Sequence, residues 1–108
     1  MDEGGLMRTL AVMNENARSW NRTWGNYVLQ IEYAVGRYGR YGTHSHLVRI
    51  ERVLSEIGEH RPGTFTVGQV FSTMPICNSQ RGQHGAKLFV DGYLDTQDIT
   101  CAKCRANL

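Results

Sequence analysis

The strongest periodic pattern in the 108-residue chain runs through residues 9–38. Its apolar residues recur at spacings of three and four positions, which is the repeat of one face of an α-helix. They are Leu10, Met13, Ala17, Trp20, Trp24, Tyr27, Ile31, Ala34 and Tyr38. Gly25 is the weak point, because glycine costs about 1 kcal/mol relative to alanine inside a helix. The pattern therefore predicts a long N-terminal amphipathic helix that bends or breaks near its middle.

The aromatic part of this face has two interpretations. It comprises Trp20, Trp24, Tyr27 and Ile31. Packing into the core of the same molecule is the simpler one. The other is a contact surface, because a long apolar face with aromatic residues needs more cover than a small domain supplies. On that interpretation the four residues form the seam of a homodimer or dock on a protein partner.

Three shorter helices are predicted after the first. Residues 45–57 carry an apolar stripe at helical spacing, made of Leu47, Ile50, Val53, Leu54 and Ile57. Thr66 and Gln69 match a capping box, which predicts a helix over 67–74 that ends before Pro75. A third helix is predicted over 79–91, followed by an extended pair with a turn at 95–98.

In this order the elements of residues 45–100 resemble a winged helix-turn-helix domain. The likeness rests on FTVGQVFSTMP as the second helix, NSQRGQHGAKLFVDGYL as the third and YLDTQDIT as the wing. The resemblance implies a small DNA-binding transcriptional regulator, often a dimer. The expected fold class is mainly α with a small β wing. We expect a single domain over 1–108, with residues 101–108 as a C-terminal stub.

Side chains suited to DNA follow from this assignment. Arginine fits guanine, glutamine fits adenine and lysine fits phosphate in a major groove. The residues concerned are Asn78, Gln80, Arg81, Gln83, His84 and Lys87, together with Arg37 and Arg40 of the basic segment 36–46. The alternative is an ordinary polar surface. Because the net charge is only +2, any attraction to a polyanion has to be local.

The three cysteines suggest a metal site. Cys77, His84, Cys101 and Cys104 offer the thiolates and the imidazole that Zn²⁺ prefers. The alternatives are a buried apolar Cys77 and a free, reduced thiol pair at the other two cysteines. His84 cannot both bind zinc and read a base, so the zinc and DNA hypotheses compete for it. If the segment is helical, either the fourth ligand comes from elsewhere, with His60 a distant candidate, or the site is absent.

Two further histidines stand in the stretch THSH. His44 and His46 are two positions apart, a spacing that can chelate a metal from a strand but not from one face of a helix. Because a helix is predicted over 45–57, we interpret them as its polar beginning.

Other function classes lack support in the sequence. The chain has no phosphate-binding glycine loop and no HExxH, so we expect a protein that is not an enzyme. It has no signal-peptide pattern and no apolar run of about 20 residues, so we expect a cytoplasmic protein without a membrane partner. The alternative to a DNA-binding regulator is a non-enzymatic adaptor or inhibitor with a structural zinc clamp, docking through its aromatic N-terminal helix.

Overall fold

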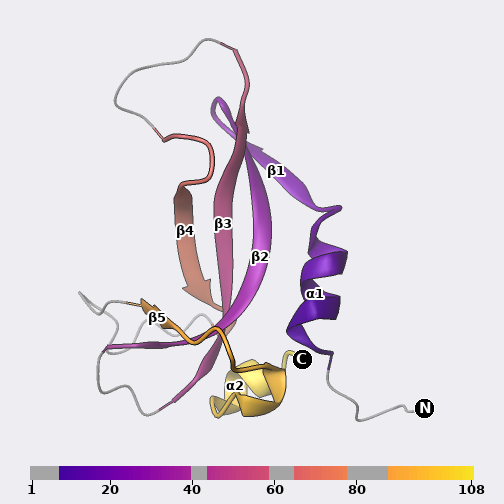
Figure 1. The fold of residues 1–108 in the computed structure, drawn as a ribbon, viewed down its shortest axis with the longest axis vertical. Coiled ribbons are helices and arrows are strands. Elements are labelled where there is room, and N and C mark those ends of the chain that lie inside the picture. Colours follow the sequence, from indigo (N-terminus) through magenta and orange to yellow (C-terminus); the bar gives the residue numbers. More distant parts are fainter. Residues whose placement is uncertain (1–7, 40–43, 59–64, 78–87) are drawn as a thin grey trace.

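The structure is a computed structural model that describes residues 8–39, 44–58, 65–77 and 88–108. These residues form an antiparallel sheet in which β1, β2, β3 and β4 lie in chain order and β5 adds to β2 (Figure 1). The strands are β1 Asn21–Trp24, β2 Tyr27–Tyr38, β3 His46–Glu56, β4 Val70–Pro75 and β5 Leu88–Val90. The protein is therefore mainly β, and the predicted mainly α fold class is wrong.

The helices are short. They are α1 Leu10–Ala17, the 3₁₀ helix η1 Thr96–Asp98 and α2 Ala102–Arg105. In Figure 1, α1 lies alongside β2 and α2 lies at the end of the sheet where β5 crosses. No described helix has the length and apolar character needed to cross a membrane.

The long helix predicted over 9–38 is wrong beyond its first third. Thr9 caps α1, with its Oγ1 accepting from the N–H of Val12 at 3.3 Å. After α1 the chain forms the hairpin of β1 and β2, whose two-residue loop places Gly25 at φ +57°. That conformation suits glycine, so the residue expected to weaken a helix makes a turn instead. In β2 the buried Leu29 and Val35 are an even number of positions apart, which is the repeat of a strand.

The first two helices of the predicted winged helix-turn-helix are not formed either. Residues predicted as the helix 45–57 form β3, and most of 67–74 is β4. Thr66 and Gln69 do make capping-box contacts, since the backbone N–H of Thr66 donates to Oε1 of Gln69 at 3.1 Å. They close a turn before a strand, because Gly68 has φ +91° and breaks the helical path.

The predicted third helix lies mostly outside the described residues, whereas the turn predicted for the wing is present. Residues 78–87 of the predicted helix 79–91 lie outside the described residues, and its end is β5. The wing turn expected at 95–98 is η1, whose cap Asp95 accepts from the N–H of Thr96 at 2.6 Å. No wing strand pairs there among the described residues.

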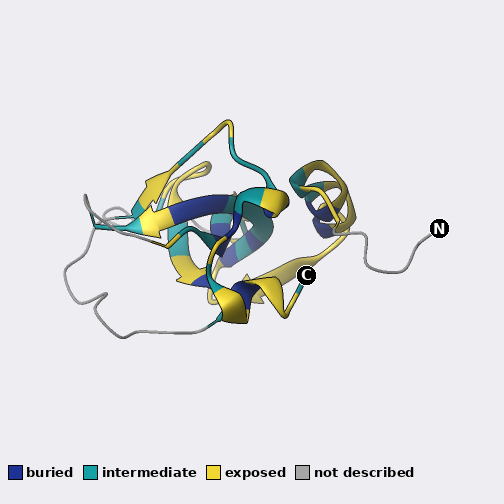
Figure 2. Cartoon of the chain, turned by 90° about the horizontal axis from the view of Figure 1, so that it is seen from below, coloured by how far each residue is buried: buried dark blue, intermediate teal, exposed yellow. Residues whose placement is uncertain are grey.

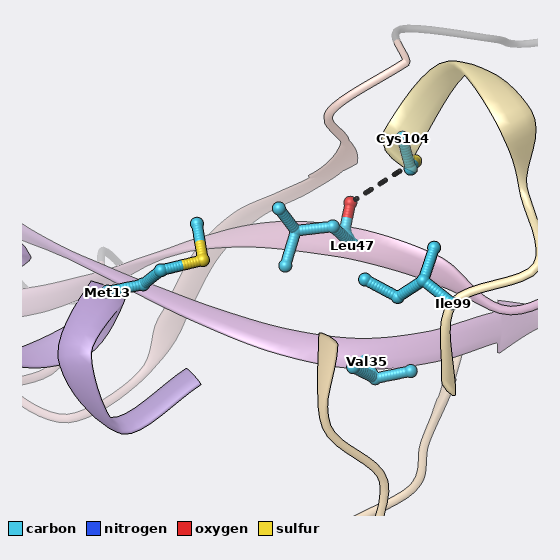
Figure 3. Packing of buried hydrophobic residues seen from close by; sticks show 5 residues of the cluster. All are labelled: Met13, Val35, Leu47, Ile99 and Cys104. Atoms are coloured by element: carbon cyan, nitrogen blue, oxygen red, sulfur yellow. Dashed lines mark hydrogen bonds between the residues drawn. The ribbon is translucent and has the colours of Figure 1, made fainter. Parts of the chain in front are cut away.

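The sheet carries two apolar clusters, and the first of them holds α1 and α2 in place. One contains Met13 of α1, Val35 of β2, Leu47 of β3, Ile99 after η1 and Cys104 of α2 (Figure 3). The other lies nearer the β1–β2 hairpin and contains Tyr27, Leu29 and Val53, with Phe65 and Phe71 against them. Figure 2 shows this burial as dark blue on the central strands and on the inward side of α1. Each large side chain buried this way contributes about 1.5–3 kcal/mol.

One edge of β2 is covered along its length by three different partners. β1 pairs with its first residues and β5 with its last. Between them, the Asn14 side chain accepts from the N–H of Tyr33 at 2.6 Å and donates to its carbonyl at 3.0 Å. The N–H of Asp91 donates to the carbonyl of Val35 at 3.0 Å. These bonds fix α1 and the chain leading to the C-terminus against the sheet.

Candidate metal centre

Four potential metal ligands from distant parts of the chain meet at one end of the sheet. His46 begins β3, Cys77 follows β4 by two residues, and Cys101 and Cys104 belong to the cap and body of α2. Their ligand atoms all lie within 4.8 Å of one another, and the group can hold a metal ion.

Two of the distances between these atoms are close to those of a tetrahedral zinc site. Nδ1 of His46 lies 3.7 Å from Sγ of Cys77 and 3.7 Å from Sγ of Cys104. In a zinc tetrahedron with Zn–S of about 2.3 Å and Zn–N of about 2.0 Å, the sulfur and nitrogen atoms are about 3.6 Å apart. The ring orientation of His46 is supported by Tyr38, whose ring packs edge-on at a centroid distance of 6.1 Å.

Backbone and hydroxyl contacts join the α2 ligands to β3. The carbonyl of Ser45 accepts from the N–H of Cys101 at 3.0 Å and of Thr100 at 3.2 Å. The Ser45 hydroxyl donates to the carbonyl of Asp98 at 2.6 Å. Because Ser45 directly precedes His46, these bonds place the cap of α2 beside the imidazole.

A second set of contacts converges on Leu47. Its carbonyl accepts from the N–H of Ile76 at 2.8 Å, which brings the neighbouring Cys77 to β3. The same carbonyl accepts from the Cys104 thiol at 3.8 Å, the contact drawn in Figure 3. The ligands are thus positioned by the fold on both sides of His46.

Of the four ligands, Cys104 is buried and the other three are half-buried. Burial raises the pKa of the Cys104 thiol to about 12. Burial also raises the pKa of Cys101, but hydrogen bonds from Cys104, Cys77 and the backbone outweigh it and leave the pKa below its usual value. Burial, then the nearby charge of His44, lowers the pKa of His46, which keeps its imidazole neutral at pH 7. A thiolate at Cys104 therefore requires a positive charge beside it.

The predicted metal site is confirmed for the grouping of its three cysteines but not for its histidine. Cys77, Cys101 and Cys104, which the sequence put forward together, do lie together. His84, the predicted imidazole, lies outside the described residues, as does His60. His46 completes the described group, although we had interpreted it as the polar beginning of a helix.

The stretch THSH contained the missing signal. Its two histidines were set aside because a helix was predicted over 45–57, yet that segment is a strand. His46 alone belongs to the group of four, and His44 is exposed. An alternative strand assignment would have made this stretch a candidate for metal binding from the sequence.

The residues proposed to read DNA lie mostly outside the described part of the chain. Of these, Arg37 is described; it is exposed and lies in β2 opposite Phe89. The others lie outside the described residues: Asn78, Gln80, Arg81, Gln83, His84, Lys87 and Arg40.

The aromatic residues proposed as a helical contact face are likewise separated. Trp20 stands between α1 and β1 and is 68% exposed, whereas Tyr27 is 6% exposed in β2. Trp24 is opposite Tyr27 in the hairpin and packs on Phe71 at a ring distance of 4.9 Å. Ile31 follows in β2, half-buried. The helix predicted to carry these residues is therefore wrong, whereas a dimer or partner contact through them stays a prediction.

Comparison of the chain with protein-family models, with curated proteins and with solved structures found no match. The function is therefore inferred from the geometry of the site.

Proposed function

We propose that the protein is a non-enzymatic binding domain whose fold is held together by a structural zinc ion. His46, Cys77, Cys101 and Cys104 would be its ligands. The observation that carries the proposal is the convergence of three sulfur atoms and one imidazole nitrogen within 4.8 Å. Three thiolates and one imidazole are a common ligand set of structural zinc, and four protein ligands leave no open position for a substrate or a reactive water.

The position of the group explains what the zinc would stabilise. The ligands come from β3, from the chain after β4 and from α2. In the described part of the chain, α2 contributes little apolar surface, since Cys104 is its one buried residue. A metal ion shared with β3 would thus add to the apolar contacts of Ile99 and Cys104 in holding α2 on the sheet.

Metal content tests the proposal directly. Elemental mass spectrometry should find one zinc per chain in the purified wild type and less than about a tenth of that in Cys104→Ser. His46→Ala should also lose most of its zinc. The matched control is His44→Ala, which removes the neighbouring exposed histidine and should retain the wild-type content. Folded wild type without metal, or full zinc content in His46→Ala, would contradict the proposal.

A second candidate function is self-association through the opposite end of the sheet. Large apolar side chains are exposed there, namely Trp24, Leu54, Ile57, Val67 and Val70, at 39–65%. An apolar surface of this kind is typical of a protein contact. Sedimentation should then show a wild-type dimer and a monomeric Trp24→Ser, Val67→Ser variant. A wild type that remains monomeric at high concentration would exclude the dimer.

A further inference from the structure

A cavity separate from the metal ligands lies between α1 and the middle of β2 and β3. Its volume is 370 Å³. Its lining comes from the chain before, within and after α1 and from the two central strands: Arg8, Met13, Asn16, Ala17, Trp20, Ile31, Tyr33 and Arg49. The volume lies within the range of small-molecule sites, about 300–1,000 Å³.

The charges around this cavity are unbalanced. Arg8 and Arg49 line it, and no described acidic residue does. A neighbouring cavity of 390 Å³ offers a comparison, since its Arg52 is paired with Glu32 at 2.7 Å between Nε and Oε1. The first cavity therefore attracts an anion more strongly than the second does.

Arg49 retains hydrogen-bonding capacity. Its Nη2 lies 3.5 Å from Oε2 of Glu51, but Arg22 binds both oxygens of that carboxylate and Ser72 donates to one of them at 2.8 Å. Nε of Arg49 is buried and has no acceptor among the described residues. A buried donor without a partner is costly, so an anion that displaced Arg49 far enough to accept from Nε would be favoured.

The indole ring of Trp20 offers a flat aromatic surface in the same lining as Arg8 and Arg49. Trp20 is 68% exposed, yet its backbone is held in place. Its N–H donates to the carbonyl of Ala17 at 2.9 Å, and Nε2 of Gln30 donates to its carbonyl at 3.3 Å. On the far side, the hydroxyl of Thr96 donates to the carbonyl of Arg8 at 2.6 Å. Both ends of the cavity lining are thus fixed to other elements.

We propose that this cavity binds a small ligand in which an anionic group, a carboxylate or a phosphate, is joined to a planar ring. Arg49 and Arg8 bind the anion, since guanidinium groups pair with both kinds of oxyanion. The ring packs on Trp20, and Tyr33 and Asn16 line the same space. This site is independent of the proposed zinc.

The test uses the metal-loaded full chain and matched probes. The Trp20 indole N–H signal is followed by NMR during titration with 2-naphthoate, 1-naphthyl phosphate, neutral 2-naphthamide and inorganic phosphate. At least one aromatic anion should bind saturably, and about tenfold or more tightly than the amide and inorganic phosphate. The anion that binds more tightly shows whether the site prefers a carboxylate or a phosphate. Equal binding of the amide, or no saturable binding of either anion, would overturn the proposal.

Variants distinguish binding in the cavity from nonspecific attraction to positive charge. Arg49→Gln should weaken the better anion about tenfold or more, and Arg8→Gln should also weaken it. Arg8 is exposed, so its variant remains informative if Arg49→Gln does not fold. Arg18→Gln is the control, because it removes the same charge from a residue that lines the neighbouring cavity. An equal loss of affinity in Arg18→Gln would show nonspecific attraction and contradict the site.

Discussion

At the scale of single residues, the most unusual group is the carboxylate of Glu51, which is 6% exposed in the middle of the sheet. The hydrogen bonds from Arg22, then that from Ser72, outweigh burial and lower its pKa from 4.5 to about 2. Nη2 of Arg22 donates to Oε1 at 2.8 Å. The sequence does not show this pairing, because Arg22 was assigned to a helix and lies 29 positions away.

Glu51→Gln should destabilise the fold in a pH-dependent manner. A depressed pKa means that the carboxylate stabilises the folded state fully above pH 4.5 and loses this effect as the pH falls to about 2. At pH 7 the variant should lose about 2 kcal/mol of unfolding free energy, measured with urea. The difference from wild type should shrink as the pH approaches 2.

Glu32→Gln is the matched control for this prediction. Its carboxylate pairs with Arg52 at 2.7 Å, but both side chains are about two-fifths exposed. An exposed pair contributes less than about 1 kcal/mol. Equal effects of the two substitutions, or an effect of Glu51→Gln that does not depend on pH, would show that the buried pairing is not what stabilises the sheet.

At the scale of elements, the assignment of each segment as helix or strand determines which residues can be predicted to lie together. Residues 27–38 and 46–56 have apolar residues at both helical and alternating spacings. Their valines, isoleucines and tyrosines favour strands, and Gly25–Asn26 is a typical two-residue hairpin loop. The three cysteines could be grouped from composition, because thiols are rare. His46 could be proposed only by assigning its segment to a strand, and its place beside the cysteines depends on the strand pairing.

Gly36 controls the pairing of β5 with β2. A Cβ atom there would lie 2.9 Å from the carbonyl oxygen of Phe89. Gly36→Ala should therefore displace β5, which precedes the metal-binding end of the chain, and cost about 1–3 kcal/mol. Thermal unfolding measures the loss, and hydrogen exchange should quicken at the amides of β5.

Gly92→Ala provides the comparison, since a Cβ atom at Gly92 meets nothing within 4 Å. It should change stability by less than about 0.5 kcal/mol. If Gly36→Ala were as well tolerated as Gly92→Ala, the close pairing of β5 with β2 would be incorrect.

At the scale of the whole molecule, the sheet has two apolar clusters, and the cluster next to the metal ligands contains one of them, Cys104. Metal binding and folding are therefore expected to be coupled. Unfolding free energy should rise by about 4 kcal/mol when free zinc exceeds its dissociation constant a thousandfold. Urea unfolding with zinc and with a chelator measures this difference; superimposable curves would contradict the coupling.

X-ray absorption at the zinc edge of the purified protein tests the central claim most directly. The account predicts three sulfur atoms at about 2.3 Å and one nitrogen at about 2.0 Å from the ion. In His46→Ala reconstituted with excess zinc, the nitrogen contribution should disappear or be replaced by oxygen. A wild-type spectrum with two or fewer sulfur atoms, or one dominated by oxygen, would contradict the metal centre formed by His46, Cys77, Cys101 and Cys104.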